Sequence, residues 1–238
     1  MPLNYVRALT ATQRSARANL HLGVALAFVA GAANAGGFLA VSQFTSHMTG
    51  IVSMMAEHVA AGALELALAG TGALLSFVAG AACCAVMVNF ARRRRMQSQY
   101  ALPLLVEAVL LLAFGVLGAR LAGVEGLFVP VTVMLLCFMM GLQNALITKL
   151  SRAEIRTTHV TGLMTDIGIE LGRLLFWRRS NADRGRLVVL TMLAAGFFIG
   201  GVAGALGFRY YGFSSTIPLA LVLIALAIVP ALDDLRRR

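Results

Sequence analysis

The hexapeptide TSHMTG at residues 45–50 is written a second time, as TTHVTG, at residues 157–162. Both copies keep the first threonine, the histidine, the second threonine and the glycine, and each copy follows an apolar stretch. Weaker matches keep the same order in both halves of the chain: GAANA (31–35) with GLQNA (141–145), FVAGA (77–81) with FIGGV (198–202), and Pro103 with Pro218. This order predicts that the chain consists of two related halves.

The composition is that of a chain that meets little water. Of its 238 residues, 59% are hydrophobic and only 13% are charged, and the mean hydropathy is +0.84. A soluble domain carries about a quarter charged residues. The net charge of +10 does not indicate nucleic-acid binding, because the arginines lie between apolar segments, as in the cytoplasmic loops of membrane proteins. The three cysteines show no metal-binding spacing and are expected to pack between helices.

Six apolar stretches are long enough to cross a bilayer, which needs about 20 helical residues. Two further segments, 50–68 and 162–177, have a helical pattern but carry charged side chains. We expect these two to be short re-entrant or interfacial helices. The predicted spans are Leu20–Val41, Ala69–Ala91, Leu102–Leu121, Leu127–Thr148, Leu187–Phe208 and Ile217–Leu232.

Basic residues gather in alternate loops of this arrangement. They lie in residues 1–19, at Arg92–Arg95 and between 149 and 186, whereas 122–126 and 209–216 carry almost none. Because cytoplasmic loops are enriched in Lys and Arg, six spans place both termini in the cytoplasm. A seventh span, formed by 50–68, is the alternative.

The predicted fold class is therefore an all-α membrane protein built as a three-plus-three repeat. An odd number of spans in each half inverts the second half relative to the first. In transporters built from inverted repeats, broken helices meet near the midplane and bind substrate there. The predicted parts are a basic N-terminal segment (1–19), a first membrane repeat (20–122), a second membrane repeat (123–233) and a basic tail (234–238).

The repeated hexapeptide has the chemistry of a helix break followed by a helix N-terminus. Its glycine permits a sharp turn, its Ser and Thr side chains suit an N-cap, and its histidine titrates near neutral pH. A helix N-terminus favours an anionic or carbonyl-bearing ligand. The alternative is structural: each histidine bonds to a loop carbonyl at the membrane interface. The candidate substrate-binding residues are Asn34, His47, Thr49, Gly50, Asn144, Thr158, His159, Thr161 and Gly162.

Ionisable side chains near or inside the predicted spans are candidates for proton or ion coupling. Asp166 and Glu170 form one stripe with Arg173, while Met54 and His58 take the equivalent positions in the first half. The stripe equally fits an amphipathic interfacial helix with an Arg–Glu pair facing water. The coupling candidates are Glu57, His58, Glu107, Asp166 and Glu170, of which Glu107 lies inside the third span.

The pentapeptide SHMTG (46–50) after an apolar span and the run GLQNALITKLSRAEIRTTHVTGLMTDIGIELGR (141–173) carry a resemblance to a known family. The chain resembles the YoaK family of bacterial inner-membrane proteins, which is defined by a domain of unknown function. The resemblance covers nearly the whole chain and implies a multi-pass protein of the bacterial cytoplasmic membrane. It implies no substrate and no catalytic or binding residue. One departure is GAANAGG (31–37), where the family commonly carries an aspartate.

The leading functional hypothesis is a secondary transporter or channel for a small solute, of which an anion suits the helix N-termini. We then expect His47, His159, Asn34 and Asn144 to converge in one cavity. The alternative is a non-transporting factor in membrane assembly, stress or lipid interaction, and an intramembrane enzyme is the weakest option. No catalytic residue, metal site or cofactor is predicted; the expected partners are the lipid bilayer and an unknown solute, with a homo-oligomer left open.

Overall fold

The computed structural model describes residues 15–96, 98–121, 125–150, 159–176 and 182–236. Within these ranges the chain is helical and contains no β-strand, which confirms the all-α prediction. The first four helices are α2 (Ala16–Val41), α3 (Met48–Ala60), α4 (Leu64–Arg93) and α5 (Ala101–Leu121). They are followed by α6 (Glu125–Leu150), α7 (Val160–Phe176), α8 (Ala182–Tyr211), the 3-10 turn η1 (Gly212–Ser215) and α9 (Thr216–Arg236).

The same order of helix lengths occurs twice. Helices α2 to α5 have 26, 13, 30 and 21 residues, and helices α6 to α9 have 26, 17, 30 and 21. The short helices α3 and α7 begin at the equivalent positions Met48 and Val160, each directly after the histidine of its hexapeptide. Pro103 and Pro218 each stand in a first helical turn, where a missing amide hydrogen is tolerated.

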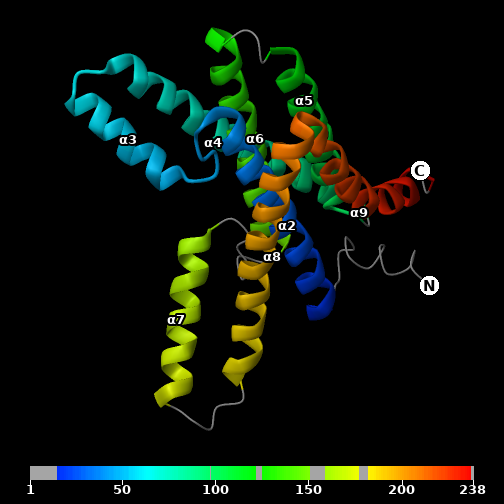
Figure 1. The fold of residues 1–238 in the computed structure, drawn as a ribbon. Helices are drawn as coiled ribbons and strands as arrows, with labels where there is room; N and C mark the ends of the chain where they lie inside the picture. The colour runs from blue at the N-terminus through cyan, green and yellow to red at the C-terminus, as the bar shows by residue number, and fades with distance from the viewer. Residues whose placement is uncertain (1–14, 97, 122–124, 151–158, 177–181, 237–238) are drawn as a thin grey trace.

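The core of the molecule is made by helices from opposite halves (Figure 1). The first helix of each half packs along the third helix of the other half: α2 on α8 and α6 on α4. The fourth helices, α5 and α9, pack on each other. Helices α2 and α8 are parallel, because the residue numbers of contacting positions rise together along both helices. Gly196 lies against Val24, Gly200 against Phe28 and Gly204 against Ala32.

Glycines allow these crossings to be very close. A β-carbon at Gly31 would collide with the backbone carbonyl of Phe197, and a β-carbon at Gly141 would collide with that of Phe77. The reciprocal contacts also match, since Gly200 lies against the carbonyl of Phe28 and Gly80 against that of Phe138. Gly80 is thus the counterpart of Gly200 rather than of Gly201, which corrects by one residue the sequence match of FVAGA with FIGGV.

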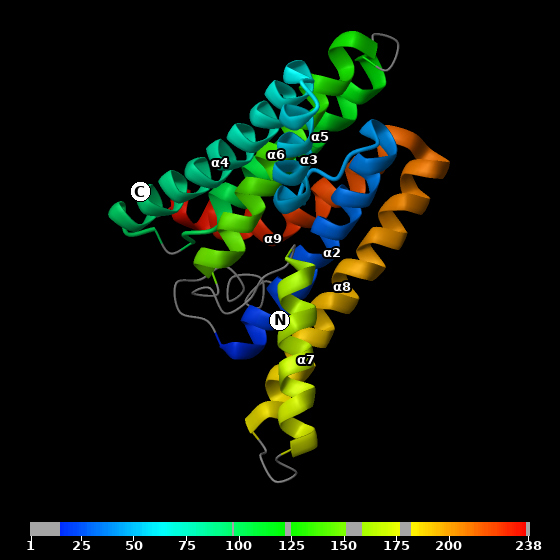
Figure 2. The same ribbon diagram turned by 90° about the vertical axis from the view of Figure 1, so that its left-hand side faces the viewer.

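The short helices lie outside this core, on two projecting hairpins. Helix α3 packs on the first part of α4, and α7 packs on the first part of α8. Figure 1 shows both hairpins extending away from the central crossing, and Figure 2 shows the α7–α8 hairpin from a second side. The expectation of one helix over 50–68 was wrong. The chain turns at Gly62, whose φ of 74° is accessible to glycine without strain, and Glu65 belongs to α4.

Among the described residues, five helical stretches are long and apolar enough to cross a membrane: Arg17–Val41, Leu64–Arg93, Ala101–Arg120, Val129–Lys149 and Gly185–Asp234. The fifth stretch is 50 residues long and contains both the fifth and the sixth predicted spans. It reverses direction at η1, which begins at Gly212 with a φ of 56°. Helices α8 and α9 are therefore separate elements inside one continuous apolar stretch.

Candidate functional site

The first hexapeptide positions its histidine over its own glycine. His47 is the N-cap residue of α3, and a β-carbon at Gly50 would collide with the His47 imidazole ring. Gly50 lies inside the helix, so it does not form the sharp turn that we expected. The expected Ser or Thr cap is also wrong in this copy, because His47 occupies the N-cap position and makes no side-chain capping bond. The glycine therefore leaves room for the imidazole.

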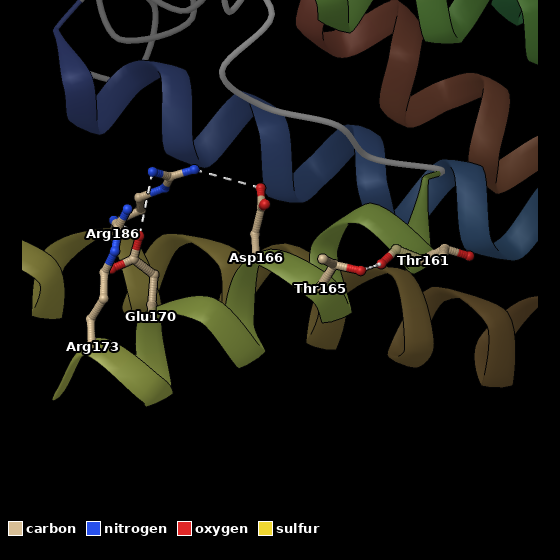
Figure 3. Close-up of polar contacts among 6 residues, drawn as sticks. All are labelled: Thr161, Thr165, Asp166, Glu170, Arg173 and Arg186. Carbon is tan, nitrogen blue, oxygen red and sulfur yellow. Dashed lines mark hydrogen bonds and ion pairs between the residues drawn. The ribbon is translucent and has the colours of Figure 1, made fainter. Parts of the chain in front are cut away.

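The second hexapeptide begins its helix in the same way. The amide of Leu163 donates to the His159 carbonyl at 3.1 Å, as the amide of Ile51 does to the His47 carbonyl at 3.1 Å. Thr161 is exposed, and its carbonyl accepts a hydrogen bond from the Thr165 hydroxyl at 2.9 Å (Figure 3). The predicted binding residue Thr158 lies outside the described residues. His47, Thr49 and His159 are exposed, while Gly50 and Gly162 are half-buried.

The asparagine shared by GAANA and GLQNA takes part in a hydrogen bond in each half. The Ser46 hydroxyl donates to Asn34 Oδ1 at 2.8 Å, which joins the first hexapeptide to α2. Next to it, Thr45 is 1% exposed and its hydroxyl has no hydrogen-bond partner. In the second half, Asn144 Nδ2 donates to the Met140 carbonyl at 2.8 Å. Both asparagines are half-buried.

The two motifs do not converge. Helices α2 and α6 run antiparallel, because Gln143 Nε2 donates to the Leu26 carbonyl at 3.2 Å while Gly37 lies against Leu136. Asn144 is therefore level with Leu26, eight residues from Asn34, which is about 12 Å along a helix. Among the described residues α3 packs on α4 and α7 on α8, and no packing joins α3 to α7. The expected convergence of His47, His159, Asn34 and Asn144 in one cavity is therefore not found among the described residues.

An ion-pair cluster joins α7 to α8 (Figure 3). Arg186 of α8 contacts Glu170 Oε1 at 3.4 Å and Asp166 Oδ2 at 3.6 Å. Arg173 contacts the same Glu170 oxygen at 3.0 Å. The Glu170 side chain is only 2% exposed, whereas Asp166 is 43%, Arg173 52% and Arg186 57% exposed. We call these four residues the ion-pair cluster.

The ion-pair cluster changes the interpretation of the acidic stripe on α7. Both acids are paired with arginines, and Glu170 is held between two of them. A buried carboxylate is stabilised by such charge-assisted contacts. The α3–α4 hairpin has no equivalent cluster, because Met54 and the half-buried His58 stand at the equivalent positions and Glu57 is exposed. The cluster is thus a feature of one hairpin only.

Two residues were not predicted from the sequence: Arg186 in the ion-pair cluster and Gln143 at the α2–α6 crossing. Arg186 was counted as one of many basic loop residues, although α8 starts four residues earlier, at Ala182. Gln143 stands beside the noted Asn144, is fully buried at the α2–α6 crossing, and leaves its Oε1 without a partner. The signal for Gln143 was available, because a polar amide inside a predicted span is costly to bury.

Glu107 occupies a different position from the other acids. It lies in α5, is 1% exposed, and neither carboxylate oxygen has a hydrogen-bond partner in the described part of the chain. Glu107 therefore does not contact solvent at the surface of the molecule. Cys84 and Cys137 are also fully buried and unbridged, which agrees with their expected packing role.

Comparisons with known proteins identify a family of unknown function. Residues 22–229 match the family described as "Protein of unknown function (DUF1275)". The chain is 27% identical over 202 residues to the "UPF0700 transmembrane protein YoaK" of Bacillus subtilis (strain 168), covering 83% of this chain and 88% of that protein. No solved structure matches. Because several of its helices are long and apolar enough to cross a membrane and its relative is a transmembrane protein, the chain is a multi-pass membrane protein. It belongs to the DUF1275 family of proteins of unknown function.

Proposed function

We propose that this protein is a secondary transporter or channel for a small solute, built as an inverted repeat of three spans in each half. In this arrangement α2, α4, α5, α6, α8 and α9 cross the bacterial cytoplasmic membrane, and both termini are cytoplasmic. Helices α3 and α7 lie in the two projecting hairpins. No catalytic reaction is part of the proposal.

The observation that carries the proposal is the direction of the packed helices. With six spans, α2 and α8 both leave the cytoplasm and α4 and α6 both return to it. The glycine contacts make α2 and α8 parallel, and Gly72 near Met134 followed by Phe77 near Gly141 makes α4 and α6 parallel. Thr216 at the start of α9 lies against Gly115 in the second half of α5, and Asp234 near the end of α9 accepts a hydrogen bond from Ser98 just before α5, so α5 and α9 are antiparallel, as the same topology requires.

A physical argument connects this arrangement with the proposed transport. Inverted repeats support alternating access, because one half can rock against the other around a central site. Here helices from the two halves cross at glycines that bring their backbones close together. At the α2–α6 crossing, the side-chain oxygen of Gln143 has no hydrogen-bond partner among the described residues. Each motif then faces one side of the membrane, with Asn34 and His47 on the outer side and Asn144 and His159 on the cytoplasmic side.

The topology is tested by labelling single cysteines. In a variant in which Cys83, Cys84 and Cys137 are replaced by alanine, Thr49→Cys and Thr161→Cys are introduced separately. Both threonines are exposed. A membrane-impermeant maleimide is expected to label Thr49→Cys only in right-side-out vesicles and Thr161→Cys only in inside-out vesicles. Labelling of both positions from the same side would disprove the inverted repeat.

The solute is sought by thermal shift, because a ligand that binds the native state raises its apparent stability. The purified protein is screened against inorganic anions and small metabolites, and each stabilising compound is then followed as radiolabelled flux into proteoliposomes. We expect the double variant His47→Ala with His159→Ala to lower that flux, and the exposed Thr191→Val to leave it unchanged. No shift and no flux across the panel would favour the alternative.

That alternative is a non-transporting factor in membrane assembly, stress or lipid interaction. One observation favours it: the α3–α4 hairpin has an exposed apolar surface formed by Val59, Leu64, Leu66 and Leu68. Such a surface fits lipid or another membrane protein equally well. Crosslinking in intact membranes separates the two functions, since a partner factor yields a defined crosslinked product and a solute transporter retains flux when purified alone.

A further inference from the structure

A carboxyl group lies buried in α5 without any compensating contact. Glu107 is 1% exposed, and both of its oxygens lack a hydrogen-bond partner among the described residues. An isolated carboxylate in a low-dielectric interior is strongly unfavourable even after the surroundings relax. The group therefore requires a neutralising partner, which is either a bound cation or a proton.

The helices packed against α5 offer few charges to Glu107. On α4, Cys84 lies within electrostatic range of both Glu107 and Lys149, which stands near the end of α6. On α9, the carboxylate of Asp234 lies near the helix end, where it accepts a hydrogen bond from the Ser98 amide at 2.9 Å. Lys149 forms no ion pair with Glu107 in the described part of the chain.

The surroundings favour a proton over a metal ion. A hard cation takes about six or more oxygen ligands. The described residues contain no group of three or more His, Cys, Asp or Glu side chains that could hold a metal. A proton needs no cage, because a protonated carboxyl group is neutral and can remain in an apolar site.

This buried carboxyl group has no counterpart at the equivalent described position of the second half. In the second half the residue equivalent to Glu107, counted from the matched prolines, is Val222, which is 40% exposed. Along α5, Glu107 is two turns from Tyr100, about 10 Å away. The Tyr100 hydroxyl donates to the Lys149 carbonyl at 3.2 Å, which makes this end of α5 the polar end nearest to Glu107.

We propose that Glu107 holds an exchangeable proton inside the membrane and is the single proton-coupling site of the transporter. The coupling role rests on the proposed function, whereas the exchangeable proton does not. During a cycle the proton binds one carboxylate oxygen of Glu107 and later leaves it to water, with no other bond formed or broken.

Infrared spectroscopy of the protein in lipid vesicles tests this directly. The wild type is expected to show the carbonyl stretch of a protonated carboxyl group, and the band should shift in D2O. Glu107→Gln should reduce the band area to background, whereas Glu65→Gln, at an exposed carboxylate in the first turn of α4, should leave it unchanged. Absence of the band in the wild type, its persistence in Glu107→Gln, or its failure to shift in D2O would overturn the proposal.

A conservative variant protects the test against a folding defect. Glu107→Asp keeps a carboxyl group, so it should move the band in frequency without removing it, even if Glu107→Gln does not fold. The infrared experiment and the cysteine labelling test the two proposals independently. Labelling of Thr49→Cys and Thr161→Cys from one side disproves the inverted repeat while the Glu107 band persists, and loss of the band disproves the proton site while the topology stands.

Discussion

The backbone carbonyl of Phe77 lies so close to Gly141 that any β-carbon there would collide with it. The same contact recurs in the other half of the molecule between Phe197 and Gly31. These two contacts place α4 on α6 and α8 on α2 with the same geometry. Because a carbonyl cannot move without its helix, each glycine sets the separation of two helices from opposite halves.

Gly141→Ala is expected to destabilise the protein by about 1–3 kcal/mol, the usual cost of overpacking a close contact. The colliding atom is backbone, so the helices α4 and α6 must separate. The measurement is equilibrium or thermal unfolding in detergent. Gly168→Ala is the matched control: nothing lies within 4 Å of its β-carbon position, so it should gain up to about 1 kcal/mol from helix propensity. Equal effects of both substitutions would contradict the close crossing.

Arg186→Ala should loosen the α7–α8 hairpin by about 1–2 kcal/mol. Breaking a fully buried ion pair costs roughly 3–5 kcal/mol, but Arg186 is 57% exposed and Arg173 still holds Glu170. Asp166→Asn should cost less than about 1 kcal/mol, because Asp166 is 43% exposed and its contact with Arg186 is long at 3.6 Å. Hydrogen exchange of α7 amides measures the change. Arg209→Ala, an exposed arginine on the same helix α8, should leave that exchange unaltered.

Some helix ends were predicted closely from the sequence, because apolar runs end where polar residues begin. Leu102–Leu121 was predicted and α5 is Ala101–Leu121; Leu20–Val41 was predicted and α2 also ends at Val41. The break at Gly62 was missed, because helical periodicity continues across it on both sides. A single glycine inside a helical pattern does not distinguish a turn from a tolerated helix position.

The candidate site was less predictable than the fold. The hexapeptide predicted two equivalent helix starts, and their first backbone bonds match. The sequence pattern did not show that the His47 ring lies over Gly50, because the position of the ring depends on the side-chain rotamer of His47 and not on the spacing of the residues. The separation of Asn34 from Asn144 depends on how α2 and α6 cross, which is a long-range contact. The pairing of Arg186 with Glu170 likewise depends on the register of a hairpin.

Gly50→Ala should displace the His47 ring without unfolding the protein. The colliding atoms belong to the end of a side chain, which can rotate away, and alanine in place of glycine inside a helix gains up to about 1 kcal/mol. The displaced imidazole should react faster with diethylpyrocarbonate, measured by peptide mass spectrometry of the His47 fragment. His58, which is half-buried on the same helix, serves as the internal reference. An unchanged ratio of the two rates would show that the ring does not rest on Gly50.

Ser46→Ala should lower stability by about 0.5–1.5 kcal/mol, the net contribution of a typical hydrogen bond. Its hydroxyl donates to Asn34 Oδ1 at 2.8 Å and attaches the first hexapeptide to α2. If this bond is the main link, Ser46→Ala combined with Asn34→Ala should cost less than the sum of the two single changes in an unfolding experiment. The control is Ser53→Ala, an exposed position on α3 where alanine only improves helix propensity. Strict additivity of the two substitutions would mean that the hexapeptide is held in place by other contacts.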